Sequence, residues 1–276
     1  MGSQVNIWLD EEKDITAIVD EVEAIEAQLS RFRSQSELNT LNRQTQRWVY
    51  VSETLQVNVE QALYAAYLTE GLVTPLVLRA LVMAGYDRDF PTLEPTFVDG
   101  PIHLHDWQDI QILEGRVWVP DEIDLGGTAK GWTAQHIARQ FDRILVDMGG
   151  DIVARGKLWK VYVADPFDPE TLFTTVLLED MAIATSGTDY RRWGVEQHHI
   201  IDPRTARPAI TDVLSATVIY PDAVMAEAMA KAVLLLGSQQ GLEWLQQHPH
   251  AAGLVFCHDG AVLATDNFQS YIQQGA

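Results

Sequence analysis

Apolar residues recur at helical spacing in two stretches near the start of the chain. The first stretch predicts a helix from a cap at Asp14 to about Arg33. Its apolar positions are Ile15, Ile18, Val19, Val22, Ile25 and Leu29. The second stretch predicts a helix from a Ser52 cap to Leu68, with Gly71 placed to end it. A short apolar run at residues 7–9 predicts a strand before both helices.

Short apolar runs and helical patterns follow one another along the rest of the chain. Residues 72–120 are interrupted by prolines and predict irregular structure with one strand at residues 117–119. Further helices are expected at residues 130–141, at 223–236 with a stop at Gly237, and at 242–247. The chain is expected to close with a hairpin whose turn is His258-Asp259-Gly260. The remaining strands are expected at residues 144–146, 160–163, 174–178, 181–183 and 214–220.

The order of these elements predicts an α+β fold with mixed sheets and helices. Helices and strands do not alternate strictly, so a parallel α/β arrangement is not favoured. No internal repeat or low-complexity linker divides the 276 residues. We therefore expect a single compact unit, one domain over residues 1–276.

The charge balance of the chain narrows the classes of partner. The sequence has 19 basic and 39 acidic residues, which gives a formal net charge of −20. Such a field repels nucleic acid phosphates and anionic lipid surfaces, so neither is an expected partner. A dianionic substrate therefore needs local cations or backbone amides to hold it.

Three further features of the sequence bear on location. No apolar run is long enough for a membrane span, and the N-terminus lacks the basic and apolar regions of a signal peptide. The single cysteine, Cys257, lies in an apolar run and is expected to be a buried thiol, so no intramolecular disulfide is possible. These features predict a cytoplasmic protein without membrane insertion.

A glycine-containing turn at residues 124–131 leads into one of the predicted helices. Its glycines allow a ligand to approach the backbone, the helix N-terminus favours anions, and Lys130 adds a positive charge. The segment matches neither a P-loop nor the dinucleotide fingerprint. A phosphate site and a plain turn are both compatible with it.

Two adjacent histidines, His198 and His199, precede an Asp-Pro turn. An imidazole that titrates near neutral pH can accept a proton from a hydroxyl nucleophile. Neighbouring residues of a strand point to opposite faces, so the two side chains are not expected to bind one metal ion together. Structural and catalytic roles are both open for this segment.

Two other glycine-containing segments follow or end apolar strands. Residues 184–189, Ala-Thr-Ser-Gly-Thr-Asp, are expected to form a small-residue loop, and residues 146–151 contain Gly149 and Gly150. Either segment can hold a ligand or form only a turn. The chain lacks the Gly-x-Ser-x-Gly elbow of serine hydrolases and the histidine and cysteine spacing of zinc sites.

Taken in order, these segments resemble the successive signatures of the ApbE family of FAD:protein FMN transferases. Met1-Gly2-Ser3 is similar to the family's opening Met-Gly-Thr, and residues 29–42 resemble its Ser-Glu-Leu segment. The lysine-bearing glycine turn, Gly149-Gly150-Asp151, residues 184–187 and the His-Ile-Ile-Asp-Pro-Arg-Thr run at 199–205 follow. The resemblance covers nearly the whole chain and implies an ApbE-like fold with the flavin site in a cleft.

The resemblance implies a magnesium-dependent phosphoryl transfer. Members of the family take FAD, move its FMN half onto a threonine or serine hydroxyl of an acceptor protein, and release AMP. On this basis His199 is the candidate base, and Phe32 offers an aromatic face to a ring. The nucleotide is expected to contact Met1, Phe32, Leu72, Val73, Thr74, Asp124, Lys130 and Ile201.

The sequence departs from the family at the late helix that the resemblance assigns to magnesium. There the family has an aspartate and, one turn later, a threonine, whereas this chain has Glu227 and Lys231. The remaining implied ligand is the backbone carbonyl of Gly127. Lys231 can partly replace the metal by neutralising the pyrophosphate, or form a salt bridge with Glu227 in a vestigial site. Alternatively, magnesium still binds Glu227 and Gly127 while Lys231 swings away.

The leading hypothesis is FMN transfer from FAD to an acceptor protein that the sequence does not identify. A catalytically impaired FAD-binding relative, or an FAD hydrolase that gives FMN and AMP, are the alternatives. His199, Lys130 and Asp124 favour an enzyme. The Glu227 and Lys231 substitutions favour the binding protein, as does Thr74, where the family often has aspartate. Ala206 stands where the family often has glycine.

Overall fold

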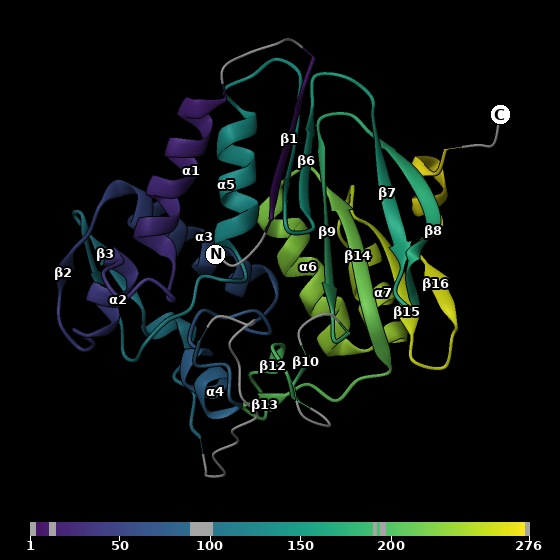
Figure 1. Ribbon diagram of the computed structural model, residues 1–276. Coiled ribbons are helices and arrows are strands. Elements are labelled where there is room, and N and C mark those ends of the chain that lie inside the picture. The colour runs from purple at the N-terminus through teal and green to yellow at the C-terminus, as the bar shows by residue number, and fades with distance from the viewer. Residues whose placement is uncertain (1–3, 11–14, 89–101, 190–191, 194–196, 274–276) are drawn as a thin grey trace. The chain divides into compact units, whose positions relative to one another are not determined.

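The computed structural model of the chain describes residues 4–10, 15–88, 102–189, 192–193 and 197–273. Contacts divide them into two units that interleave along the sequence. The first takes in the described parts of residues 14–130 and 191–209, and the second those of residues 3–13, 131–190 and 210–276. Helices and sheets are combined in both units (Figure 1), so the predicted α+β class is confirmed. The single domain over residues 1–276 stays a prediction.

The first unit combines helices with short antiparallel strands. Its helices are α1 (Thr16–Leu29), α2 (Glu37–Asn42), α3 (Glu53–Leu68) and α4 (Leu78–Met83). The 3-10 turn η2 (Trp107–Asp109) is followed by β3 (Gln111–Leu113) and β4 (Arg116–Trp118). These two strands form a sheet with β2 (Val49–Tyr50), in the order β2-β4-β3. Two further antiparallel pairs are β10 (Arg192–Trp193) with β11 (Gln197–His198), and β12 (Ile201–Asp202) with β13 (Arg207–Pro208).

Side-chain caps and left-handed residues decide where the helices of the first unit begin and end. The Ser52 hydroxyl accepts a hydrogen bond from the backbone N–H of Leu55 at 3.2 Å, so α3 begins at the predicted cap. Gly71, with φ of +83°, follows the end of α3 as predicted. Helix α1 is shorter than expected because Ser30 is already extended. The sequence pattern did not predict α2 and α4, because each has only six residues and so shows less than two turns of helical periodicity.

An antiparallel seven-stranded sheet, in the order β1-β5-β6-β9-β14-β15-β16, forms the centre of the second unit. Helix α6 (Ala223–Leu236) packs against β9 and β14, and α7 (Ser238–Gln246) packs against α6 and β15 (Figure 1). The hairpin β7 (Trp159–Asp165) with β8 (Asp168–Leu178) and the turn η3 (Asp266–Tyr271) complete the unit. The strands are β1 (Val5–Leu9), β5 (Ile144–Met148), β6 (Asp151–Arg155), β9 (Met181–Gly187), β14 (Val213–Tyr220), β15 (Ala252–Cys257) and β16 (Val262–Ala264).

Both faces of the central strand β14 are covered. Ile219 packs in one apolar cluster with Val161 and Val176 of the β7–β8 hairpin. The alternate residues of β14 point to the opposite face, where α6 lies. Because α6 is apolar nearly all round, almost all of its residues are buried, and the predicted helix at 223–236 is confirmed. Gly237, with φ of +87°, ends it.

The small-residue loop predicted at residues 184–189 is wrong, because β9 continues through Gly187. Thr185 and Ser186 pair with Thr217 and Ala216 of β14, and the hydroxyls of Thr185 and Thr217 lie 2.8 Å apart. The backbone of this segment is therefore used in the sheet. Its small side chains reflect close packing between the sheet and α6.

Candidate functional site

Separate segments of the first unit meet around the buried guanidinium of Arg31. Its Cζ atom lies 4.1 Å from the ring centroid of Phe32 and 4.5 Å from that of Tyr86. Its Nη1 donates a hydrogen bond to the carbonyl of Tyr86 at 2.9 Å, and Nε lies 3.4 Å from Oδ1 of Asp124. Among the described residues, the buried Nη2 has no hydrogen-bond partner. Arg31 thus joins the predicted contacts Phe32 and Asp124 and keeps donor capacity for a further partner.

An aromatic cluster brings Phe32 together with the predicted contact Ile201. Phe32 packs against a buried group that includes Tyr86, Trp193 and Ile201. The ring centroids of Phe32 and Tyr86 are 5.7 Å apart, and those of Tyr86 and Trp193 are 5.4 Å apart. Trp193 is anchored because its Nε1 donates to the carbonyl of Ala84 at 2.7 Å. Tyr86 and Trp193 escaped sequence analysis, because neither lies in a segment with a recognised motif.

The predicted contacts Leu72, Val73 and Thr74 form the turn that follows α3. The backbone N–H of Val73 donates to the hydroxyl of Thr69 at 3.0 Å, and that of Leu76 donates to the hydroxyl of Thr74 at 3.2 Å. The backbone N–H of Asp124 donates to the carbonyl of Pro75 at 2.8 Å. This bond places Pro75, the residue after Thr74, against Asp124. The predicted nucleotide contacts at residues 72–74 and at Asp124 are therefore adjacent.

The glycine turn is short and closes directly into α5 (Ala129–Ala138). The carbonyl of Leu125 accepts hydrogen bonds from the backbone N–H groups of Thr128 and Ala129, at 3.0 and 2.8 Å. Gly127 and Lys130 are both partly buried. Asp124 and Lys130 thus stand at the two ends of this turn, six residues apart in the sequence.

Within the second unit, α5 packs closely against the beginning of α6. A Cβ atom on Gly131 would lie 2.8 Å from the carbonyl oxygen of Ala223, so a side chain has no room there. Gln135 accepts a hydrogen bond from the backbone N–H of Ala223 at 2.7 Å and donates one to Asp222 at 2.9 Å. The sequence placed Gly131 in the glycine turn but did not predict this packing role, and it did not single out Gln135, because the partners of both are more than 80 residues away.

The adjacent histidines have different surroundings. His198 is buried, its Nδ1 accepts a hydrogen bond from the backbone N–H of Ile200 at 3.2 Å, and its Nε2 lies 3.0 Å from the carbonyl of Ala209. Because Nδ1 accepts, the proton is on Nε2, and this imidazole is a neutral structural element. His199 is only partly buried and lies between β11 and β12. His198 therefore has a structural role, whereas the side chain of His199 is partly exposed.

A tight turn follows Ile201, as the Asp-Pro sequence predicted. The carbonyl of Asp202 accepts a hydrogen bond from the backbone N–H of Ala206 at 2.8 Å. The Asp202 carboxylate accepts hydrogen bonds from the guanidinium of Arg204, which raise the pKa of Arg204. Ala206 has a φ of +54°, in the left-handed region that glycine adopts more readily.

The two ionisable side chains of α6 pair with each other. Nζ of Lys231 lies 3.7 Å from Oε1 of Glu227, and the side chains are 18% and 6% exposed. Magnesium prefers six oxygen ligands in octahedral geometry, whereas an ammonium group has no lone pair to offer. No group of three or more His, Cys, Asp or Glu side chains suited to a metal occurs in the described part of the chain. The side chains of α6 therefore do not fit a divalent metal ion as they stand.

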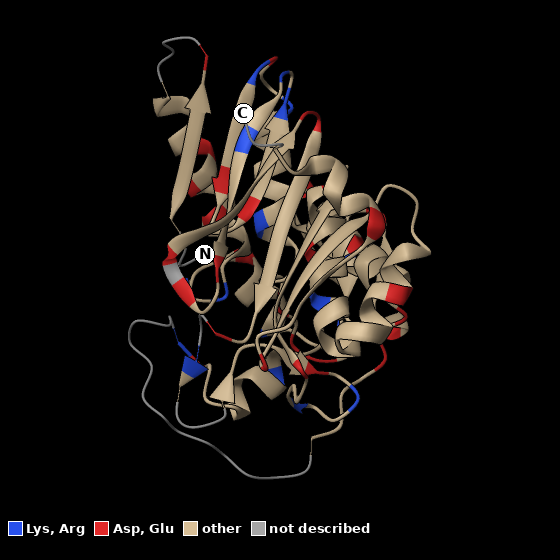
Figure 2. Cartoon of the chain, turned by 90° about the vertical axis from the view of Figure 1, so that its right-hand side faces the viewer, with Lys and Arg blue, Asp and Glu red and all other residues tan. Residues whose placement is uncertain are grey.

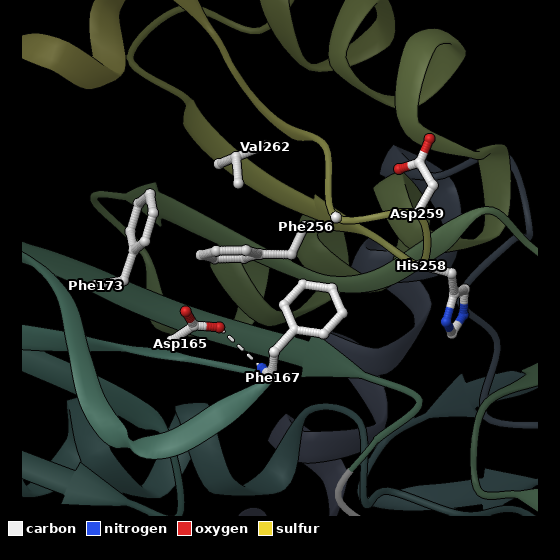
Figure 3. Close-up of a pocket in the computed structure, with 8 residues that line it drawn as sticks. Asp165, Phe167, Phe173, Phe256, His258, Asp259 and Val262 are labelled. Carbon is white, nitrogen blue, oxygen red and sulfur yellow. Dashed lines mark hydrogen bonds between the residues drawn. The ribbon is translucent and has the colours of Figure 1, made fainter.

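A separate shallow hollow lies in the second unit, with a volume of about 280 Å³. Figure 3 shows the rings of Phe167, Phe173 and Phe256 around it, with the carboxylate of Asp165 at one side. His258, Asp259, Gly260 and Val262 complete its lining. None of the predicted site residues lines this hollow, so it is not the candidate flavin site.

Acidic side chains outnumber basic ones in the chain (Figure 2). An anionic ligand therefore depends on the few cations that lie near the predicted site residues. Arg31 and Lys130 are such cations in the first unit, and Lys231 is one in the second. None of the described helices is long and apolar enough to cross a bilayer. Met1, a predicted contact, lies outside the described residues.

Comparison with known proteins covers both units. A family model described as the ApbE family matches residues 1–256. The FAD:protein FMN transferase of Treponema pallidum is 31% identical over 273 residues, which cover 86% of this chain and 75% of that protein. The ApbE protein of Thermotoga maritima superimposes with a TM-score of 0.85 at 26% identity, covering 99% of this chain and 97% of that one. The flavin transferase ApbE of Vibrio cholerae gives a TM-score of 0.81 at 25% identity, covering 98% and 96%.

The matched residues include Arg31 and its neighbours in the first unit and most of the sheet and helices of the second unit. The matched residues begin at the N-terminus and continue into β15, well beyond half of the chain. Agreement in sequence and in fold over the same length has one explanation, which is common descent: the chain belongs to the ApbE family.

Proposed function

We propose that this chain is an FAD:protein FMN transferase, which moves FMN from FAD onto a threonine or serine hydroxyl of an acceptor protein and releases AMP. The observation that carries the proposal is the agreement, over 86% of the chain, with a relative of that name. The first unit supports it, because Phe32 and Asp124 both contact Arg31. Ile201 lies in the apolar cluster against which Phe32 packs, and the turn at residues 72–74 leads into Pro75, whose carbonyl bonds Asp124.

The reaction is a phosphoryl transfer in which the acceptor oxygen attacks the phosphorus of the FMN half. A P–O bond to the acceptor forms, the bond to the AMP phosphate breaks, and the hydroxyl proton passes to a base. We assign this base to His199. Its neighbour His198 has both ring nitrogens engaged with backbone groups, so it is not available for this role.

We assign nucleotide binding to the residues that the resemblance implies. Phe32 and Ile201 offer aromatic and apolar surface to a ring, and the buried Nη2 of Arg31 can donate to a polar group of the ligand. Lys130 and the backbone amides at the start of α5 suit an anionic pyrophosphate. The remaining assigned contacts are Met1, Leu72, Val73, Thr74 and Asp124. The position of this site in a cleft also remains part of the proposal.

Magnesium is the ion that the family's chemistry implies, and it would offset the charge of the phosphates. By resemblance, the carbonyl of Gly127 and the carboxylate of Glu227 are its candidate ligands. Because Lys231 already neutralises Glu227, we assign no step of the reaction to the ion.

A mass-resolved incubation with FAD tests the proposal. The protein is incubated with a threonine-containing acceptor peptide, or with the same peptide carrying alanine at that position, and AMP and peptide mass are measured together. AMP release with an FMN-sized mass gain on the threonine peptide alone supports the transferase. AMP release without any mass gain indicates an FAD hydrolase instead. FAD binding without AMP release indicates a relative that binds flavin and has lost catalysis.

A further inference from the structure

The shallow hollow of the second unit lies between the β7–β8 hairpin and the last two strands of the sheet. Phe256 of β15 is only 2% exposed, and its ring centroid lies 4.8 Å from that of Phe173 in an edge-to-face arrangement. Phe173 and Phe167 are themselves 42% and 53% exposed, and Figure 3 shows the three rings around the hollow. Scattered exposed apolar side chains are common, whereas a cluster of them is typical of an interaction site.

The charges at the hollow favour a cationic partner. Asp165 and Asp259 line it, and none of its described lining residues is Lys or Arg. Oδ1 of Asp165 accepts a hydrogen bond from the backbone N–H of Phe167 at 2.9 Å, which holds the carboxylate beside the rings. A carboxylate can accept several hydrogen bonds, so Asp165 keeps capacity for an ammonium or guanidinium group, whose charge also suits the ring faces. The formal net charge of −20 attracts such a partner over a longer distance.

Strand β16 offers backbone groups to an extended chain at the edge of the sheet. It is the last of the seven strands in the described part of the chain. The backbone N–H of Cys257 donates to the carbonyl of Ala261 at 2.8 Å, and bonded and non-bonded pairs alternate along antiparallel strands. Val262 and Ala264 therefore occupy non-hydrogen-bonded pairs with β15, and their N–H and C=O groups point away from it. Such outward groups are a template for the addition of a strand.

Val262 connects this edge with the hollow. It is 40% exposed, it lines the hollow, and it pairs with Phe256 of β15. Directly opposite residues of antiparallel strands have their side chains on the same face, with Cβ atoms about 4.5–5.5 Å apart. A segment added along β16 therefore places a side chain beside Val262, on the face that contains the hollow. Because arginine and lysine side chains are long, one at that position can extend over Val262 to the phenylalanine rings.

We propose that β16 and the hollow together form a docking site for an extended segment of a partner protein that carries an arginine or lysine. The segment adds a strand to β16 through backbone hydrogen bonds. Its basic side chain enters the hollow, where the charged group pairs with Asp165 and lies against the rings of Phe167 and Phe173. All of these residues belong to the second unit, and the inference does not depend on the proposed function.

Fluorescence polarisation with the labelled peptide Thr-Val-Thr-Arg-Thr-Val-Thr tests the docking site. Its β-branched residues favour an extended strand, and a matched peptide carries glutamine in place of arginine. We expect the unmodified protein to bind the arginine peptide at least about fivefold more tightly than the glutamine peptide, the combined effect of one ion pair and one cation–ring contact. Propylguanidine, the arginine side chain without a backbone, is expected to bind more weakly than the arginine peptide because it cannot pair with β16.

Variants of the hollow and of the strand edge test the two parts of the site separately. Asp165→Asn and Phe167→Ala are each expected to weaken binding of the arginine peptide by about threefold, and the double variant by about tenfold. Glu179→Gln is the matched control for charge, because Glu179 is an exposed carboxylate of the second unit outside the hollow. Ala264→Pro removes an outward N–H from β16 and is expected to weaken binding of both peptides by about threefold. Thermal unfolding of each variant shows whether it is folded.

The proposal is overturned if the two peptides bind with equal affinity, or if the arginine peptide does not bind at concentrations up to about 1 mM. It is also overturned if propylguanidine binds as tightly as the arginine peptide, which would make the hollow a site for a free organic cation. A folded Ala264→Pro protein that binds the arginine peptide unchanged would exclude strand addition and so overturn docking along β16. The comparison of peptides needs no variant and decides the question even where a variant does not fold.

Discussion

Gly131 in α5 has no room for a side chain, because a Cβ atom there would lie 2.8 Å from the carbonyl oxygen of Ala223, the first residue of α6. The obstacle is backbone, which cannot rotate away as a flexible side chain can. Gln135, one turn later, makes hydrogen bonds to the same end of α6. The spacing between the two helices is thus set by one glycine and one glutamine.

Gly131→Ala is expected to destabilise the protein by about 1–3 kcal/mol, the usual cost of overpacking. Alanine is the better helix former by about 1 kcal/mol, so the same exchange at an open helical site would stabilise. The sign of the change in unfolding free energy, measured in urea, therefore distinguishes the two situations. A more stable Gly131→Ala protein would show that the helices separate at little cost.

Arg31→Lys is expected to destabilise the first unit by about 2 kcal/mol or more and to weaken FAD binding. Lysine keeps the charge but loses the planar guanidinium that lies on Phe32 and Tyr86 while bonding Tyr86 and approaching Asp124. Arg33→Lys is the matched control, because Arg33 is 46% exposed and pairs with Glu26 at the surface. Equal effects of the two exchanges on urea unfolding and FAD affinity would contradict a special role for Arg31.

The histidine pair allows catalysis and structure to be tested with one type of substitution. His199→Gln is expected to lower AMP release by about 10²–10⁴-fold, the range for losing a general base, while FAD affinity changes little. His198→Gln is expected to act mainly on stability, by about 1–2 kcal/mol, because it disturbs bonds to Ile200 and Ala209. AMP release and thermal unfolding are measured for both. Undiminished AMP release in His199→Gln would remove this residue from the mechanism.

Much of the fold could be predicted from the sequence where a pattern is long and local. Helix α6 was predicted with its observed bounds, because fourteen consecutive helix-compatible residues lie between a capping Asp222 and Gly237. The predicted closing hairpin is also confirmed, since Cys257 N–H bonds the carbonyl of Ala261 and Gly260 adopts a φ of +89°. The loop predicted at residues 184–189 was wrong, because small residues are common in turns, whereas here they belong to strand β9, which packs closely against α6.

The candidate site was predictable only through its motifs. Phe32, Asp124 and Ile201 were expected to act together. The structure places Phe32 and Asp124 against Arg31 and packs Phe32 against the cluster that contains Ile201. The role of Arg31 itself was not predictable, because it depends on Tyr86, 55 residues further along the chain. A local pattern carries no information on such a contact.

Ala206→Gly is expected to stabilise the protein slightly, by up to about 1 kcal/mol. Ala206 has a φ of +54°, where a Cβ atom is strained by roughly 1–2 kcal/mol and glycine is not. The gain is partly offset because glycine loses more backbone entropy on folding. Ala209 is a buried alanine nearby whose φ is not positive, so Ala209→Gly should destabilise the protein instead. Urea unfolding of both variants checks the opposite signs, and destabilisation of equal size would contradict the strain.

Asp212→Asn is expected to lower the unfolding free energy at neutral pH by about 0.5–1 kcal/mol, a modest value because the carboxylate is exposed to solvent. The Ser238 hydroxyl and backbone N–H donate hydrogen bonds to this carboxylate and hold its pKa below the usual 3.8. A carboxylate with a lowered pKa in the folded state stabilises above its unfolded value, and the contribution disappears as pH falls through the folded pKa.

The difference in unfolding free energy between the unmodified protein and the Asp212→Asn variant should therefore be constant from neutral pH down to about pH 5 and shrink below about pH 4. Urea unfolding at pH 7 and at pH 3 measures it directly. Ser238→Ala is the matched variant, because it removes the hydroxyl donor and leaves the carboxylate able to ionise. An Asp212→Asn effect of the same size at both pH values would show that the lost interaction does not depend on the charge of Asp212.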